Sequence, residues 1–223
     1  MTPTSRIKFD PTSKDIILIT YPPGGFGNFV YHLLTEFAAE TVKSNNNSFK
    51  FGAGGNSHNT KKYTVTYYHD PTFYFPYIDS DVDTKNKKIL VLIDNAYYDN
   101  EYVRLRTFFP NASIVRMCLT VDIDYIVAAL LASKTQGLPV ELNRDRPFGQ
   151  IWGFEPMEQE NIVNVPIKEF MLDPETTFKQ LLDDLGLTLI NETSLVSLLA
   201  NWRSVHKPYF IELYKEFHKE HLL

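Results

Sequence analysis

The sequence is poor in cysteine and has no long apolar run. Cys118 is the only cysteine, which excludes an intramolecular disulfide and zinc sites with several cysteine ligands, and we expect no bound metal. No apolar segment reaches the length that crosses a bilayer, and residues 1–15 lack the apolar core of a signal peptide. We therefore expect a cytoplasmic protein without a membrane partner.

Positive charge is also scarce, because the formal net charge is −5. Phosphate backbones need a basic binding face, so the charge argues against a nucleic-acid partner. A small anionic ligand would have to be met by local positive charge. The length of 223 residues suits one large domain, and we expect a single domain over residues 1–223.

Apolar runs alternate with helical patterns along most of the chain. The runs that we interpret as buried strands are 15–21, 62–70, 87–94, 112–119 and 161–167. The helical patterns between them cover 29–43, 98–109 and 122–133. Strands that alternate with helices predict an α/β three-layer sandwich with a mostly parallel central sheet.

The last part of the chain is predicted to be helical. Asp173 suits an N-cap, Pro174 the first helical position and Gly186 the end of a helix. Asn191 can cap a second helix that turns apolar residues such as Trp202 inward. A third amphipathic helix follows Pro208.

The stretch Ile19–Leu34, "ITYPPGGFGNFVYHLL", joins the first strand to the first helix. Glycines at 24, 25 and 27 allow a tight turn whose N–H groups, together with the start of the helix, favour an anion. The nucleotide-binding signature G-x-x-x-x-G-K-[ST] is absent, which disfavours ATP or GTP hydrolysis. The competing interpretation is a turn whose glycines serve packing alone. Asn28 is most simply an N-cap, with ligand contact as the alternative.

This stretch resembles the first signature of sulfotransferases, "TYPKSGTTWL". The resemblance extends to "VPIKEFMLDPETTFKQLLDDLGL" and to "ASIVRMCLTVDIDYIVAAL", and so covers most of the chain in order and spacing. It implies a P-loop-like sulfotransferase fold that binds the donor 3′-phosphoadenosine 5′-phosphosulfate (PAPS). The implied reaction moves a sulfuryl group to a hydroxyl acceptor, with carbohydrates among the candidates.

The resemblance also implies roles for individual residues. The loop that would hold the 5′-phosphosulfate comprises Pro23, Gly24, Gly25, Phe26, Gly27 and Asn28. Pro23 stands where the family has its loop lysine, so positive charge must come from elsewhere. The candidates are Arg104, Arg106, Lys134, Arg144 and Arg146. His69 ends a predicted strand beside Asp70 and is the candidate base, the alternative being a histidine bonded to backbone.

Two other functions remain open. "GGFGNFVYHLL" also resembles the "GGLGNQLFQYA" opening of fucosyltransferases, which implies a nucleotide-sugar glycosyltransferase. The loss of the loop lysine fits a non-catalytic nucleotide- or anion-binding protein on a sulfotransferase scaffold. In each case the ligand is expected at the carboxyl ends of the strands. That edge would hold 21–28, His69, Asp94 and the stretch after Leu119.

Overall fold

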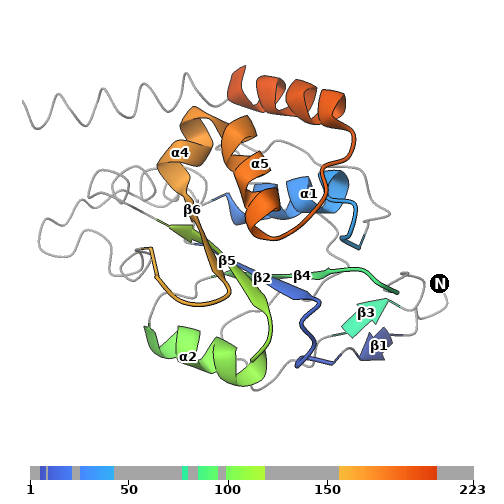
Figure 1. The fold of residues 1–223 in the computed structure, drawn as a ribbon, viewed down its shortest axis with the longest axis vertical. Coiled ribbons are helices and arrows are strands. Elements are labelled where there is room, and N and C mark those ends of the chain that lie inside the picture. Colours follow the sequence, from blue (N-terminus) through green and yellow to red (C-terminus); the bar gives the residue numbers. More distant parts are fainter. Residues whose placement is uncertain are drawn as a thin grey trace, which may run out of the picture.

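The computed structural model of the chain describes residues 6–8, 10–21, 26–42, 77–79, 85–94, 99–118 and 156–204. Its centre is a four-stranded sheet in the order β4-β2-β5-β6 (Figure 1). The strands are β2 (Ile16–Tyr21), β4 (Ile89–Asp94), β5 (Ser113–Cys118) and β6 (Ile162–Pro166). All neighbouring pairs are parallel. The predicted α/β class with a parallel sheet is therefore confirmed.

Strand β2 occupies a central position in this sheet. All six of its residues are buried, as expected of an apolar strand covered on both faces. It pairs with β4 from Ile16 to Tyr21 on one side and with β5 on the other. At the start of β2, the Lys88 ammonium lies 2.8 Å from the Asp15 carboxylate and links the starts of β4 and β2.

Helices cover the two faces of the sheet unequally. Helices α1 (Gly27–Phe37), α4 (Ile167–Leu172) and α5 (Pro174–Asp184), and a further helix over 192–204, lie on one face (Figure 1). Helix α2 (Asp99–Phe108) lies on the other. Alternate residues of each strand point to opposite faces of the sheet and so contribute to two cores. One core is shared with α1, α4 and α5, and the other is shared with α2. Each large apolar side chain buried there contributes about 1.5–3 kcal/mol to the free energy of unfolding.

The boundaries of the C-terminal helices follow the sequence signals. Asp173 accepts a hydrogen bond from the Thr176 N–H (3.2 Å), and Pro174 begins α5. Gly186 follows the helix with a φ of 63°, a conformation that favours glycine. Residue 191 directly precedes the helix over 192–204, whose inner side buries Trp202.

The first helix differs from the prediction at both ends. It begins at Gly27 rather than residue 29, and it ends at Phe37 rather than residue 43. The apolar pattern continues past Phe37, but Ala38 is extended and bridges Leu189, and Thr41 bridges Lys88. Backbone pairing with distant segments therefore ends the helix before its apolar pattern ends.

A second, two-stranded sheet had no counterpart in the sequence prediction. β1 (Arg6–Lys8) pairs antiparallel with β3 (Tyr77–Asp79). Strands of three residues are too short to show a periodic pattern. The predicted strand 62–70, the helix 122–133 and the helix after Pro208 lie outside the described residues. Within the described ranges, no helix is both long and apolar enough to cross a membrane.

The strand order changes direction between β2 and β5. The next described parallel strand after β2 is β4, on one side of it, whereas β5 is followed by β6 on the other side. In parallel α/β sheets, ligands bind at the carboxyl ends of the strands where the strand order reverses in this way.

Candidate functional site

The candidate site lies at the carboxyl ends of β2 and β5. Tyr21 ends β2 opposite Asp94 of β4, and Cys118 ends β5 opposite Pro166 of β6. Helix α1 begins at this edge, so that three of the predicted ligand-binding residues, Phe26, Gly27 and Asn28, are at the carboxyl end of the central strand. The remaining predicted site residues lie outside the described residues: Pro23, Gly24, Gly25, His69, Lys134, Arg144 and Arg146.

The first turn of α1 offers backbone N–H groups to a ligand. The Phe26 carbonyl accepts hydrogen bonds from the N–H groups of Phe29 and Val30, both at 2.9 Å. The N–H groups of Gly27 and Asn28 precede these first helical bonds, and such groups bind anions readily. The first turn contains no acidic residue that would compete with an anion.

Gly27 is explained by packing. A Cβ atom at position 27 would overlap the Tyr21 ring, a contact that real Cβ atoms do not show. The buried Tyr21 ring therefore needs a glycine at position 27, and α1 can start directly against the end of β2. This contact accounts for the glycine without any ligand. It also means that a bulky residue at 27 would disturb the fold before it reported on binding.

Asn28 is not the N-cap that the sequence indicated. The N-cap is Phe26, which makes no side-chain capping bond, and Asn28 is the second residue inside the helix. The Asn28 side chain is only 3% exposed. No described residue provides a hydrogen-bond partner for its Oδ1 atom. Asn28 correctly indicated the start of a helix in the sequence, but its side chain does not cap that helix.

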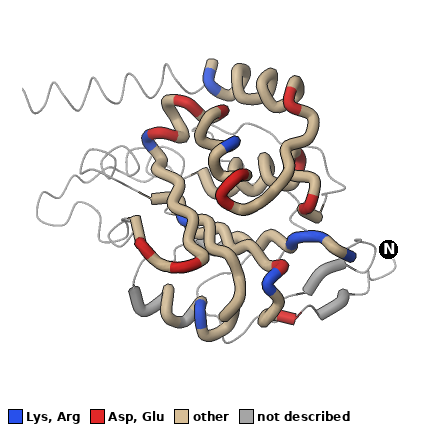
Figure 2. Tube along the Cα trace, viewed as in Figure 1, with Lys and Arg blue, Asp and Glu red and all other residues tan. Residues whose placement is uncertain are grey.

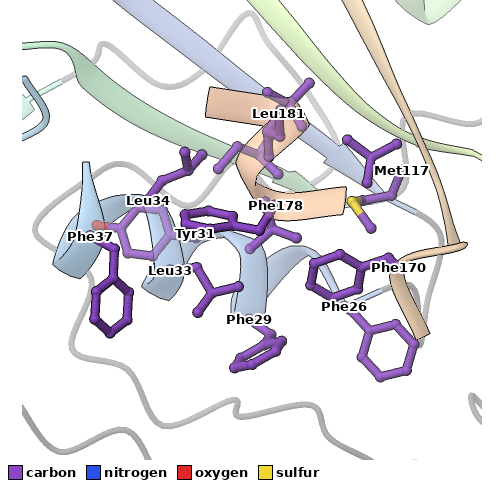
Figure 3. Packing of buried hydrophobic residues seen from close by; sticks show 14 of the residues in the cluster. Phe26, Phe29, Tyr31, Leu33, Leu34, Phe37, Met117, Phe170, Phe178 and Leu181 are labelled. Atoms are coloured by element: carbon purple, nitrogen blue, oxygen red, sulfur yellow. The ribbon is translucent and has the colours of Figure 1, made fainter. Parts of the chain in front are cut away.

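Phe26 fixes the start of α1 through an unusual backbone. Its φ of 59° and ψ of 12° are left-handed, which costs a residue with a Cβ about 1–2 kcal/mol. Its ring meets Trp202 edge-on, at 5.5 Å between ring centroids. Figure 3 shows Phe26 beside Phe29 and Phe170 within the buried cluster. Burial of the ring in this aromatic cluster offsets the backbone cost.

The same cluster ties the start of α1 to the C-terminal helices. The rings of Phe29 and Trp202 stack at 4.8 Å, with 15° between their planes. The ring centroid of Phe170, in α4, lies 6.4 Å from that of Phe26 and 6.0 Å from that of Phe29. Offset and edge-to-face ring pairs add to the free energy of burial. The first turn of α1 therefore packs against α4 and against the helix over 192–204.

Charge near the site is low among the described residues. Figure 2 shows the Lys, Arg, Asp and Glu residues mainly on the outer helices and connections. Burial lowers the pKa of His32, one turn into α1, to about 4, so His32 is neutral at pH 7. An anion at the described part of the site would therefore meet N–H dipoles rather than a charged His32.

Arg116 is the one buried cation among the described side chains, at 5% exposure. Its neighbours Val115 and Met117 belong to the core shared with α1, so strand alternation puts Arg116 on the α2 face. No role was expected for Arg116 from the sequence. The available signal was an arginine inside the apolar strand 112–119, because arginine is rarely buried without a partner.

The described geometry offers an oxyanion the backbone N–H groups at the start of α1. Arg106, one of the expected cations, instead donates to the Ala112 and Glu160 carbonyls, which precede β5 and β6. A scan against protein-family models found no match for this chain, and searches among curated proteins and among solved structures found none either.

Proposed function

We propose that the chain binds a nucleotide at the carboxyl edge between β2 and β5 and transfers a sulfuryl group. PAPS is the proposed donor and a hydroxyl compound is the acceptor. The parallel α/β sheet supports this proposal at the level of fold class. The resemblance of "TYPPGGFGNFVYHLL" to the sulfotransferase signature supports it at the level of the ligand.

The observation that carries the proposal is the start of α1. Two N–H groups, at Gly27 and Asn28, come before the first helical hydrogen bonds at the end of the central strand. The proposed site is beside the change in strand order between β2 and β5, where parallel sheets bind ligands. A phosphoryl or sulfuryl group fits these donors.

The reaction needs a base and a cation in addition to these donors. The bond between sulfur and the bridging oxygen of the 5′-phosphate breaks, and a bond from sulfur to the acceptor oxygen forms. His69 takes the proton of the acceptor hydroxyl. Lys134, Arg144 and Arg146 compensate the charge that develops on the leaving phosphate, because Pro23 cannot do so. These assignments are part of the proposal.

A binding assay separates this function from its alternatives. Melting temperatures with 3′,5′-adenosine bisphosphate, GDP and ATP should rise most with the bisphosphate, because a ligand that binds the native state stabilises it. Preference for GDP would favour the glycosyltransferase. Bisphosphate binding without sulfuryl transfer from PAPS to any hydroxyl acceptor in a panel would favour the non-catalytic protein. No binding of any of the three nucleotides would contradict both transferases and would leave only a protein that binds some other anion.

Two variants then test the catalytic assignments. His69→Ala should lower turnover by roughly two to four orders of magnitude and leave the affinity for the bisphosphate nearly unchanged. Arg144→Ala combined with Arg146→Ala should weaken donor binding, and the loss should shrink at high salt because salt screens the charges. Unchanged turnover in His69→Ala would remove it as the base.

A further inference from the structure

We infer that Asn28 is a ligand-contacting residue, whose side-chain amide binds an oxygen of a tetrahedral oxyanion at the start of α1. This rests on the proposed function only in placing the ligand at that helix terminus. The sulfotransferase resemblance includes Asn28 in the 5′-phosphosulfate loop but does not say which of its atoms contacts the ligand.

The first argument is the burial of an unused polar group. The Asn28 side chain is 97% buried, and no described residue supplies a hydrogen bond to its Oδ1 atom. Buried side-chain amides are nearly always hydrogen-bonded, because leaving one without a partner costs the free energy of its desolvation. Other buried polar side chains of the same region do have partners. Thr35 donates to the Tyr31 carbonyl at 2.8 Å, and Thr41 to the Leu34 carbonyl at 2.7 Å.

The second argument is direction. Side chains in a helix lean toward its N-terminus, so a residue in the first turn leans past the start of the helix. Asn28 is the second residue of α1 and directly follows Gly27. Its amide and the N–H groups of residues 27 and 28 therefore serve the same region. That region is at the carboxyl end of β2, where the fold predicts a ligand.

The chemistry of these donors selects the ligand class. Backbone N–H groups at a helix start attract negative oxygen atoms. An amide without a partner turns by 180° at little cost and then presents its NH2 group to a second oxygen of the same anion. A phosphoryl or sulfuryl group has several oxygens in the required arrangement. The occupant is accordingly a phosphate- or sulfate-type oxyanion, free or as part of a nucleotide.

The test compares Asn28→Leu with the wild type, because leucine has a similar volume and no polar atom. Calorimetry should show affinity for pyrophosphate and for 3′,5′-adenosine bisphosphate lowered about ten- to hundredfold, the effect of losing a charge-assisted hydrogen bond. The melting temperature without ligand should stay equal or rise, since an unpaired buried amide is removed. Thr35→Val is the matched control: it should lower the melting temperature and leave both affinities unchanged.

Asn28→Ala provides a second variant if the leucine protein does not fold. Alanine is smaller than asparagine, favours the helix and has no polar side-chain atom, so this variant should fold and lose oxyanion affinity as the leucine variant does. Unchanged affinity in both folded variants would overturn the inference, while bisphosphate binding by the wild type would leave the proposed function standing. Asn28-dependent binding of pyrophosphate, with the bisphosphate bound no more tightly, would support the inference and contradict the nucleotide function. A wild type that binds neither probe would overturn both.

Discussion

Phe26 is a residue at which backbone strain and side-chain burial oppose each other. Its left-handed φ favours glycine, whereas its ring is buried against Trp202 and Phe170. Replacing Phe26 with alanine should lower the free energy of unfolding by about 3–5 kcal/mol, because the lost ring leaves a cavity while the backbone strain at residue 26 remains. Replacing it with glycine should cost about 1 kcal/mol less than alanine, since glycine adopts this φ freely.

Urea denaturation of the two Phe26 variants measures the difference directly. At ordinary positions a glycine variant is less stable than the alanine variant, so the order predicted at position 26 is the reverse of the usual one. A glycine variant less stable than the alanine variant would show that the left-handed backbone does not persist in solution.

At this scale the sequence predicted the strand-to-helix junction better than the roles of its residues. The glycines and Asn28 correctly marked the start of a helix at the end of a strand. Gly27, however, is accounted for by the Tyr21 ring, and Asn28 is not a cap. Both outcomes depend on tertiary neighbours, which one local stretch of sequence does not contain.

Among the elements, α5 shows how one side chain sets a helix start. Hydrogen bonding by Thr176 lowers the pKa of Asp173, the N-cap. Asp173→Ala should lower the free energy of unfolding at pH 7 by about 1 kcal/mol. The carboxylate has the lowered pKa only in the folded state, so its contribution is present above about pH 4 and is lost as pH falls through the folded pKa.

Denaturation of wild type and Asp173→Ala at pH 7 and at decreasing acid pH tests this. The difference between the two proteins should shrink as the pH falls below about 4. The control is Asp183→Ala, an exposed position in the last turn of α5. A carboxylate is unfavourable there, and its removal should not destabilise the protein. An equal loss in both variants would contradict the capping argument.

The elements that were predicted correctly are those with strong local signals. Continuous apolar runs identified β2, β4, β5 and β6, because a parallel sheet covered on both faces has no polar side. The end of α1 was missed because Ala38 pairs with Leu189, far away in the sequence. β1 and β3 were missed because they are too short for a periodic pattern.

At the scale of the whole molecule, Trp202 joins the helix over 192–204 to the candidate site. Trp202→Ala should lower the free energy of unfolding by about 3–5 kcal/mol and should also weaken oxyanion binding, because Phe26 and Phe29 lose their partner. Val196→Ala is the control on the same helix. Val196 is 39% exposed, so its loss should cost less than about 0.5 kcal/mol.

Chemical denaturation and calorimetry of both variants measure these effects. If the alanine variant at Trp202 unfolds at the wild-type urea concentration, the aromatic cluster does not stabilise the fold. If it is destabilised but binds pyrophosphate as tightly as the wild type, the cluster supports the fold without positioning the site.

The contact between Phe26 and Trp202 has a consequence for synthesis on the ribosome. The chain emerges from its N-terminus, so the first turn of α1 leaves the ribosome well before Trp202 is added. Domains fold as units during translation, and contacts this distant in the sequence form late. A nascent chain that ends before Trp202 therefore leaves one side of Phe26 and Phe29 without its aromatic partner, a surface of the kind that chaperones bind. The start of α1 acquires its final surroundings only after the helix over 192–204 has been translated.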